Sequence, residues 1–132
     1  MKYYPQLLLI VAILLATGCQ KRDDTAPDTA KLNIQISSPV AKSSYRKGDT
    51  VFVKAAVSYI TQMHGYNVAI SDSAGLHTYY DNEDHVHGDN FQISEYWVDT
   101  LSVPAALRLR LTVVVDHDGN TKTQDLYFNT QP

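Results

Sequence analysis

The chain contains few of the residues that stabilise a small exported domain by covalent bonds. Cys19 is the only cysteine among 132 residues, so no disulfide can form within the chain. The formal net charge is only −3 and no basic patch stands out, so we expect no nucleic-acid partner. There is no internal repeat. A domain of this size must therefore be held together by its own apolar core.

Long hydrophobic runs are also lacking, apart from one at the start of the chain. Residues 7–16 are ten consecutive apolar residues, preceded by the basic Lys2. About 20 such residues are needed to cross a bilayer, whereas the apolar region of a signal peptide needs about 7–15. The run therefore predicts a signal peptide. It is followed by Ala16-Thr17-Gly18-Cys19, in which small residues precede a thiol that can be alkylated.

This segment resembles the lipobox of bacterial lipoproteins, with Ala16 at the position where leucine is commonest. The resemblance implies a signal peptide over 1–18 and a Cys19 that carries fatty acyl chains such as palmitate, followed by a flexible linker over 19–31. Two or more such chains anchor a protein stably. Gln20 is unlike the inner-membrane retention signal, which favours the outer membrane, facing the periplasm or exposed at the cell surface. Lys21 and the acids after it are similar to the export tag of Bacteroidetes surface lipoproteins, interrupted here by Arg22.

The remaining hundred or so residues alternate between apolar and polar side chains. This period of two, broken by turn residues, predicts antiparallel strands, and no stretch shows a helical period. The seven predicted strands are 32–36, 51–59, 66–70, 76–80, 91–98, 107–115 and 121–128.

Several of these features together resemble the immunoglobulin-like (Ig-like) domains of bacterial surface proteins, and in particular small Bacteroidetes lipoproteins. They are the seven strands, the approach Tyr45-Arg46-Lys47-Gly48-Asp49 to the second strand and the Asp118-Gly119-Asn120 hairpin. The resemblance covers residues 32–129, although the Cys…Trp…Cys core of antibody domains is missing. We therefore expect an all-β, seven-stranded antiparallel Ig-like sandwich over 32–132.

The sequence has five histidines, and four of them fall in connections that should share one end of such a sandwich. They are His64, His85, His87 and His117, whereas His77 should lie near the other end. Imidazole is the commonest neutral metal ligand. His85 and His87 are two residues apart in extended backbone and so point the same way. We therefore weigh a copper or zinc site formed by His64, His85 and His87, with Met63 and His117 next; the thioether of Met63 favours copper(I).

Three other sites are weighed against this one. Asp81, Glu83 and Asp84 lie on a predicted charged loop and offer hard oxygen ligands for calcium. The segment 116–120 has acidic residues as well, but it lacks the spacing of a calcium loop, and Gly119 and Asn120 favour a tight hairpin turn. Four aromatic residues could form a stacking face for a sugar, although such residues more often pair across strands. They are Tyr79, Tyr80, Tyr96 and Trp97.

No catalytic motif is present, neither a nucleophile elbow nor a zinc-protease or nucleotide-binding pattern, so we expect no enzyme. Two hypotheses remain. The first is a non-catalytic binding or structural module, bound to the membrane through its lipid and contacting an envelope protein or a glycan. The second is a copper- or zinc-binding lipoprotein that uses the histidines. Metal binding of this kind should weaken as the pH falls through about 6.5, where imidazole becomes protonated.

Overall fold

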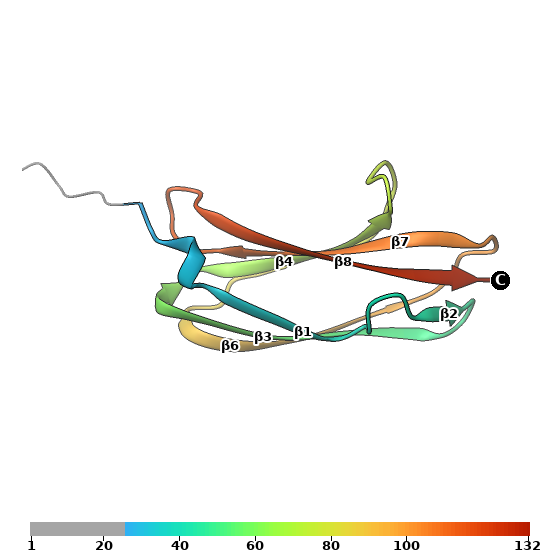
Figure 1. The fold of residues 1–132 in the computed structure, drawn as a ribbon, viewed down its shortest axis with the longest axis horizontal. Coiled ribbons are helices and arrows are strands. Elements are labelled where there is room, and N and C mark those ends of the chain that lie inside the picture. The colour runs from blue at the N-terminus through green and yellow to red at the C-terminus, as the bar shows by residue number, and fades with distance from the viewer. Residues whose placement is uncertain (1–25) are drawn as a thin grey trace, which may run out of the picture.

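A computed structural model describes residues 26–132, which form a β-sandwich (Figure 1). The predicted signal peptide, Cys19 and the first part of the predicted linker lie outside the described residues. After the short helix η1 (Thr29–Lys31), the described chain forms eight strands: β1 (Asn33–Ser38), β2 (Ser44–Arg46), β3 (Thr50–Met63), β4 (Gly65–Asp72), β5 (Thr78–Asp84), β6 (Gly88–Val98), β7 (Ala105–Val114) and β8 (Thr121–Gln131). Within residues 26–132, no helix is long and apolar enough to cross a bilayer.

The strands form two sheets that face each other (Figure 1). One sheet has the order β1-β3-β6 and the other has the order β2-β8-β7-β4-β5. All the neighbouring strands are antiparallel except β2 and β8, which are parallel. The prediction of seven strands was wrong by one, because β2 has only three residues and shows no extended alternation. It forms only because the end of β8 offers it a free edge.

The apolar residues that alternate with polar ones in the sequence are the residues that point into the core. In β7, Leu107, Leu109, Leu111 and Val113 are fully buried, and the residues between them are half-buried on the outer face. Each apolar side chain removed from water stabilises the fold by about 1.5–3 kcal/mol. Trp97 and Phe128 close the core between the sheets.

Strand β5 is longer than the sequence suggested, and this corrects the interpretation of 81–84 as a loop tip. Asp81 pairs with Ala69 and Glu83 pairs with Asn67, so the acidic segment is an edge strand beside β4. The amide of Asn67 donates a 2.6 Å hydrogen bond to Asp81. Charged side chains are common on edge strands, because they discourage pairing with another chain. The connection to β6 is thereby reduced to residues 85–87.

The two ends of the sandwich differ, and each is given a name here. The η1 end holds the start of β1, where Lys122 donates a hydrogen bond to the carbonyl of Leu32, and the connections at residues 64, 85–87 and 115–120. The far end holds residues 73–77, residues 99–104 and the C-terminus. Figure 1 shows η1 and the C-terminus at opposite ends of the long axis. Antiparallel strands return the chain to the same end at every second connection, which is why the histidine-bearing connections meet.

Candidate functional site

Three histidine rings meet at the η1 end, each carried by a different connection between strands. His64 is the single residue between β3 and β4, His87 lies between β5 and β6, and His117 lies between β7 and β8. The ring centroid of His64 is 5.3 Å from that of His87 and 3.9 Å from that of His117. These three residues are called the histidine cluster below.

Two members of the cluster, His64 and His117, line a cleft of about 250 Å³. Its lining combines imidazoles with carboxylates: His64, Gly65, Tyr66, Glu83, Asp84, His85, Val114, Asp116, His117 and Gly119. His85 therefore lies in the same site, although its ring does not stack with the other three. The predicted grouping of four histidines at one end thus agrees with the structure.

The environment of His64 favours its neutral form. Partial burial lowers the pKa of His64 below its ordinary value, and the neighbouring rings of His117 and His87 lower it further. Asp116 acts in the opposite direction but does not outweigh them. The Nδ1 atom of His64 is buried and has no hydrogen-bond partner among the described residues. A neutral imidazole with a free ring nitrogen is the form that a metal ion or a proton donor requires.

One pair of rings in the cluster has the spacing of two ligands on a metal ion, but the third ring does not. Within residues 26–132, no three or more His, Cys, Asp or Glu side chains are arranged to hold a metal ion. Two imidazoles that share a tetrahedral zinc ion have ring centroids roughly 5 Å apart. The pair His64 and His87 meets this distance with an interplanar angle of 86°, whereas His64 and His117 at 3.9 Å are too close. His117 would have to withdraw by roughly 1 Å to ligate with them.

Met63, the soft ligand that the sequence suggested, does not face the cleft. Its side chain is 0% exposed and belongs to the hydrophobic core. Met63 is the last residue of β3 and points inward, although Thr61 is exposed and the pairing of β3 with β6 shifts in register between Ser58 and Met63. The thioether is therefore a packing group, and the argument for copper(I) loses its sulfur ligand.

The segment 116–120 is a hydrogen-bonded turn, as the glycine and asparagine indicated. The carboxylate of Asp116 accepts hydrogen bonds from the backbone N–H groups of Asp118 and Asn120 and from the side-chain amide of Asn120. These bonds, led by the one from the Asn120 side chain, lower the pKa of Asp116. The carboxylate therefore holds the turn that positions His117.

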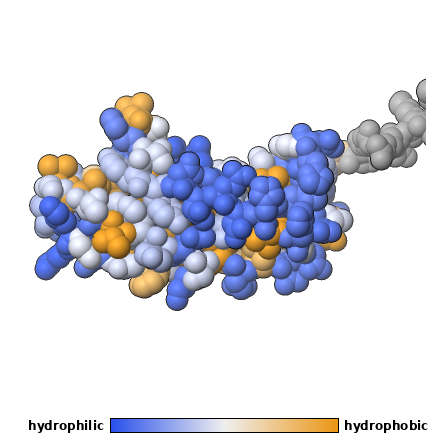
Figure 2. Space-filling model, turned by 180° about the vertical axis from the view of Figure 1, so that it is seen from behind, coloured by the Kyte–Doolittle hydropathy of each residue, from blue (hydrophilic) through white to orange (hydrophobic). Residues whose placement is uncertain are grey.

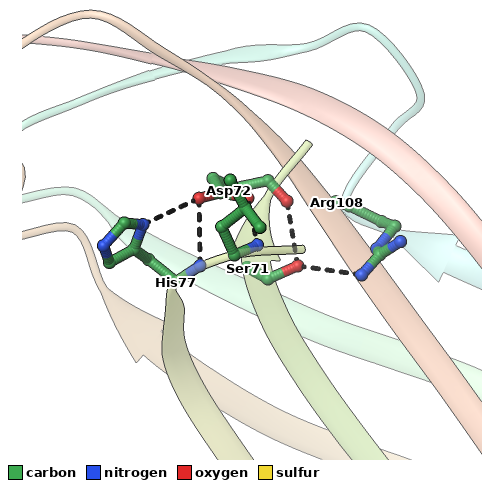
Figure 3. A network of polar contacts seen from close by, with 5 residues as sticks. Ser71, Asp72, His77 and Arg108 are labelled. Atoms are coloured by element: carbon green, nitrogen blue, oxygen red, sulfur yellow. Dashed lines mark hydrogen bonds and ion pairs between the residues drawn. The ribbon is translucent and has the colours of Figure 1, made fainter. Parts of the chain in front are cut away.

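His77 lies at the far end, as predicted, in a separate polar network (Figure 3). Its Nδ1 atom is 3.1 Å from the carboxylate of Asp72, which also accepts hydrogen bonds from the N–H groups of Leu76 and His77. The bond from Leu76 is the largest cause of the lowered pKa of Asp72. Beside it, Arg108 approaches the hydroxyl of Ser71 at 3.4 Å. The network closes the β4–β5 turn and is unconnected with the histidine cluster.

A carboxylate between the sheets was missed by the sequence analysis. Glu95 accepts hydrogen bonds from Tyr66 at 2.9 Å, Tyr80 at 2.8 Å and Asn82 at 3.1 Å, and so joins β6 to the opposite sheet. Burial and then the bond to Glu95 raise the pKa of Tyr80 to about 12, and the same two causes raise that of Tyr66. The signal was present in the sequence, because Glu95 occupies an inward position of the alternation between Ile93 and Trp97.

The four aromatic residues considered as a sugar-binding face do not share one surface. Trp97 is 7% exposed and packs beside Tyr79, with ring centroids 6.3 Å apart. Tyr80 is turned inward to Glu95. Tyr79 and Tyr96 are 37% and 63% exposed but belong to different sheets, and the neighbour of Tyr96 on its sheet is Phe52 on β3.

Comparisons with known proteins identify the fold but no family. No protein-family model matches the chain, and no curated protein matches its sequence. One similar structure is catalytically inactive OgpA from Akkermansia muciniphila, in complex with an O-glycopeptide substrate. It superposes on this chain with a TM-score of 0.55 at 12% identity. The match covers 74% of this chain but only 28% of OgpA. The fibronectin(III)-like modules of Clostridium thermocellum CbhA give 0.50 at 15% identity, covering 75% of this chain and 96% of theirs.

A third structure, the CARDB domain of the Pyrococcus furiosus protein PF1109, covers 76% of this chain and 94% of its own, with a TM-score of 0.44 and 12% identity. At such low identities the likeness concerns the fold alone. The described residues therefore form an Ig-like or fibronectin-like β-sandwich; the alternation of the sequence predicted the antiparallel sandwich, and the resemblance implied its Ig-like form.

Proposed function

We propose that this chain is a lipoprotein of the bacterial outer membrane, lipidated at Cys19, whose sandwich is a non-catalytic binding or structural module. The observation that carries the proposal is the distribution of exposed apolar side chains. Among residues 26–132, the exposed large hydrophobic residues other than Ile60 lie toward the far end of the sandwich: Val40, Phe52, Leu76, Tyr79, Tyr96, Val98, Val103 and Tyr127.

Apolar groups that a monomer leaves in water commonly mark a surface of interaction. Figure 2 shows several orange side chains at the left end of the molecule, which is the far end, and others in the right half. A lipid anchor at Cys19 would hold the η1 end toward the membrane and present the far end to partners. The resemblance to fibronectin(III)-like modules, over almost their whole length, supports a modular rather than a catalytic role.

The anchor is tested by replacing Cys19→Ser. The lipoprotein proposal expects the wild-type protein in the outer-membrane fraction with a mass increase from acyl chains. The variant should lose that mass increase and its stable membrane association, while circular dichroism shows an unchanged β-sandwich. A wild-type protein without acyl chains would contradict the proposal.

The binding module is tested in intact cells by placing a photo-crosslinking amino acid at either end of the sandwich. Val103 is 64% exposed at the far end, and Gln62 is exposed near the η1 end and serves as the matched control. The proposal expects adducts of defined mass from position 103 and none from position 62. Adducts at neither position, or equally at both, would count against it.

A second candidate function, metal binding, is favoured by the contact between three imidazoles from three separate connections. We propose His64, His87 and His117 as ligands of a zinc or copper ion, with His85 as a fourth nitrogen from the same cleft. Bringing three basic rings together is unfavourable if they are protonated. A bound cation would stabilise the neutral rings and would engage a ring nitrogen that is otherwise unpartnered.

Titration of Zn²⁺ and of Cu⁺ into the protein, purified without a histidine tag, tests this candidate. Stoichiometric, sub-micromolar binding should be lost in a variant with His64, His87 and His117 all replaced by Ala. His77→Ala is the control, because His77 lies at the far end and pairs with Asp72. Weak binding, or binding that survives the triple substitution, would remove the histidine cluster from consideration as a metal site.

A further inference from the structure

We propose that the outer face of the sheet β1-β3-β6 binds a neutral polysaccharide, with Phe52 and Tyr96 as its stacking platform. This face, called the platform face, consists of the outward residues of β1, β3 and β6. The inference rests on the proposed binding module and names the class of its ligand.

The platform face is almost free of charge. The alternation places serine, asparagine, glutamine and threonine side chains on it, and Lys54 is its only charged residue among the strands described. The outer face of the other sheet differs, because it carries ion pairs such as the one between Arg110 and Asp125, 2.7 Å apart. Amides and hydroxyls both donate and accept hydrogen bonds, as sugar hydroxyls do. The lack of charge favours a neutral ligand over an anionic one.

Two aromatic rings stand next to each other on this face. Phe52 and Tyr96 are direct partners across β3 and β6, and their side chains are 50% and 63% exposed. Directly opposite residues on one face of a sheet have Cβ atoms about 4.5–5.5 Å apart, so both rings are within reach of one extended ligand. Aromatic faces pack against the C–H surfaces of sugar rings while their surroundings stay polar. The ammonium group of Lys54 lies over the Phe52 ring, 5.7 Å from its centroid, in a cation–π contact.

Polar partners continue along the same strand from the platform. Ser94 and Gln92 occupy the next outward positions of β6 after Tyr96, and both are exposed. Val98, 43% exposed, follows on the other side, toward the far end. An extended sugar chain lying along β6 would therefore meet a stacking surface first and hydrogen-bonding groups next. This order suits a polymer with alternating C–H faces and hydroxyl edges.

A second copy of the chain is a less suitable occupant of the platform face. A stable protein interface buries about 800 Å² on each partner and has an apolar centre. Here Phe52, Tyr96 and Val98 gather at one corner of the sheet, whereas the other exposed large apolar residue of the face, Ile60, lies eight residues along β3 from Phe52, roughly 26 Å away. The residues between them are mostly polar, so the exposed apolar side chains of the face do not form one continuous apolar centre.

The test is calorimetric titration of the protein, purified in mild detergent, with cellohexaose, xylohexaose and mannohexaose, and with hexagalacturonate as an acidic probe. We expect binding of at least one neutral hexasaccharide and none of the acidic one. Tyr96→Ala and Phe52→Ala should each weaken it about tenfold, and Tyr96→Phe should retain it. Tyr127→Ala is the matched control, because Tyr127 is equally exposed, at 50%, on the outer face of the other sheet.

Circular dichroism and urea unfolding of each variant establish that the fold is intact, as expected for outward positions. The inference is overturned if no neutral hexasaccharide binds, if the acidic probe binds better, or if Tyr127→Ala weakens binding as much as Tyr96→Ala. Sedimentation that reveals a dimer dissolved by Tyr96→Ala would also overturn it, in favour of a second copy. Adducts at position 103 with no sugar binding would leave the binding module standing without this ligand.

Discussion

Glu95 shows how one side chain can join two sheets. A carboxylate that points inward from an edge strand is costly to bury unless its oxygens are hydrogen-bonded. Here Tyr66 and Tyr80, from the opposite sheet, each donate a hydroxyl hydrogen to it. Inward-pointing charges also discourage an edge strand from pairing with another chain. Glu95 therefore closes the open side of the sandwich and protects the edge of β6.

This contact makes stability sensitive to alkaline pH. The pKa of Tyr80 is raised to about 12 in the folded protein, whereas an unfolded tyrosine titrates near 10. The tyrosine is neutral in both states below pH 10, so its contribution to stability is fully present there. That contribution is lost as the pH rises from 10 through 12, because the unfolded state ionises first.

We therefore expect the free energy of unfolding to fall between pH 10 and 12, measured by urea unfolding at each pH. Glu95→Gln should lower the pKa of Tyr80, followed by absorbance at 295 nm, but only part of the way to 10, because burial is the larger cause of the shift. Tyr127→Phe, at an exposed tyrosine, is the control and should leave the alkaline slope unchanged. A Tyr80 that titrates near 10 in the folded protein would contradict this account.

At the scale of elements, the strands that the sequence predicted well are those with apolar side chains at every second position. For example, a strand was predicted over residues 107–115, and the structure has strand β7 at Ala105–Val114. Two elements were not predictable in this way. Strand β2 depends on a partner more than 80 residues away, Asn129 to Gln131 in β8. The acidic half of β5 has no apolar pattern and is extended only because β4 pairs with it.

The histidine cluster was partly predictable for a related reason. Alternating connections place His64, His87 and His117 at one end of any antiparallel sandwich, so their grouping follows from strand order alone. Which rings touch depends on the lengths of the connections, and the three-residue connection 85–87 was expected to be about three times longer. Whether Met63 faces the cleft or the core depends on a single position. Met63 is the last residue of β3 and it points inward, so its side chain lies in the core.

Gly65 determines how closely β4 approaches the end of β5. Its φ is +152°, and a methyl group on its Cα would lie 2.5 Å from the carbonyl oxygen of Asp84. We expect Gly65→Ala to destabilise the fold by about 2–5 kcal/mol, because the backbone of β5 must move. Gly119→Ala is the control. Its φ is +85° but no atom lies within 4 Å, so it should cost only about 1–2 kcal/mol.

Both variants are measured by urea unfolding, and the Gly65 variant also by NMR of the histidine rings. Because Gly65 follows His64 directly, a displaced β5 should change the chemical shifts of both His64 and His87. Equal losses of stability in the two variants would mean that the contact with Asp84 is not limiting.

On the scale of the whole molecule, the folded unit begins at Leu32. This residue is 1% exposed within the core, and its carbonyl accepts a hydrogen bond from Lys122 on the last strand. Residues 26–31 before it are exposed or half-buried and contribute no side chain to the core. The start of the domain and the end of the linker are thus defined by the burial of one leucine.

Leu32→Ala should therefore lower the free energy of unfolding by about 2–4 kcal/mol, since it leaves a cavity in the core. A chain that starts at Lys31 should be as stable as one that starts at Ala26, because both keep Leu32. Thermal unfolding of the three proteins measures these differences. A large loss on removing residues 26–30 alone would show that η1 belongs to the folded unit.

The position of the attachment point also has a mechanical consequence. The chain joins the sandwich at the start of β1, and the exposed apolar side chains lie toward the other end of the long axis. A pull between an anchor and a partner bound there would run parallel to the strands. The hydrogen bonds between β1 and β3, registered from Asn33 with Ser58 to Ser38 with Lys54, lie across that direction. Under such a pull these hydrogen bonds would be loaded all at once and not broken one after another, so the sandwich would act as a stiff mechanical link.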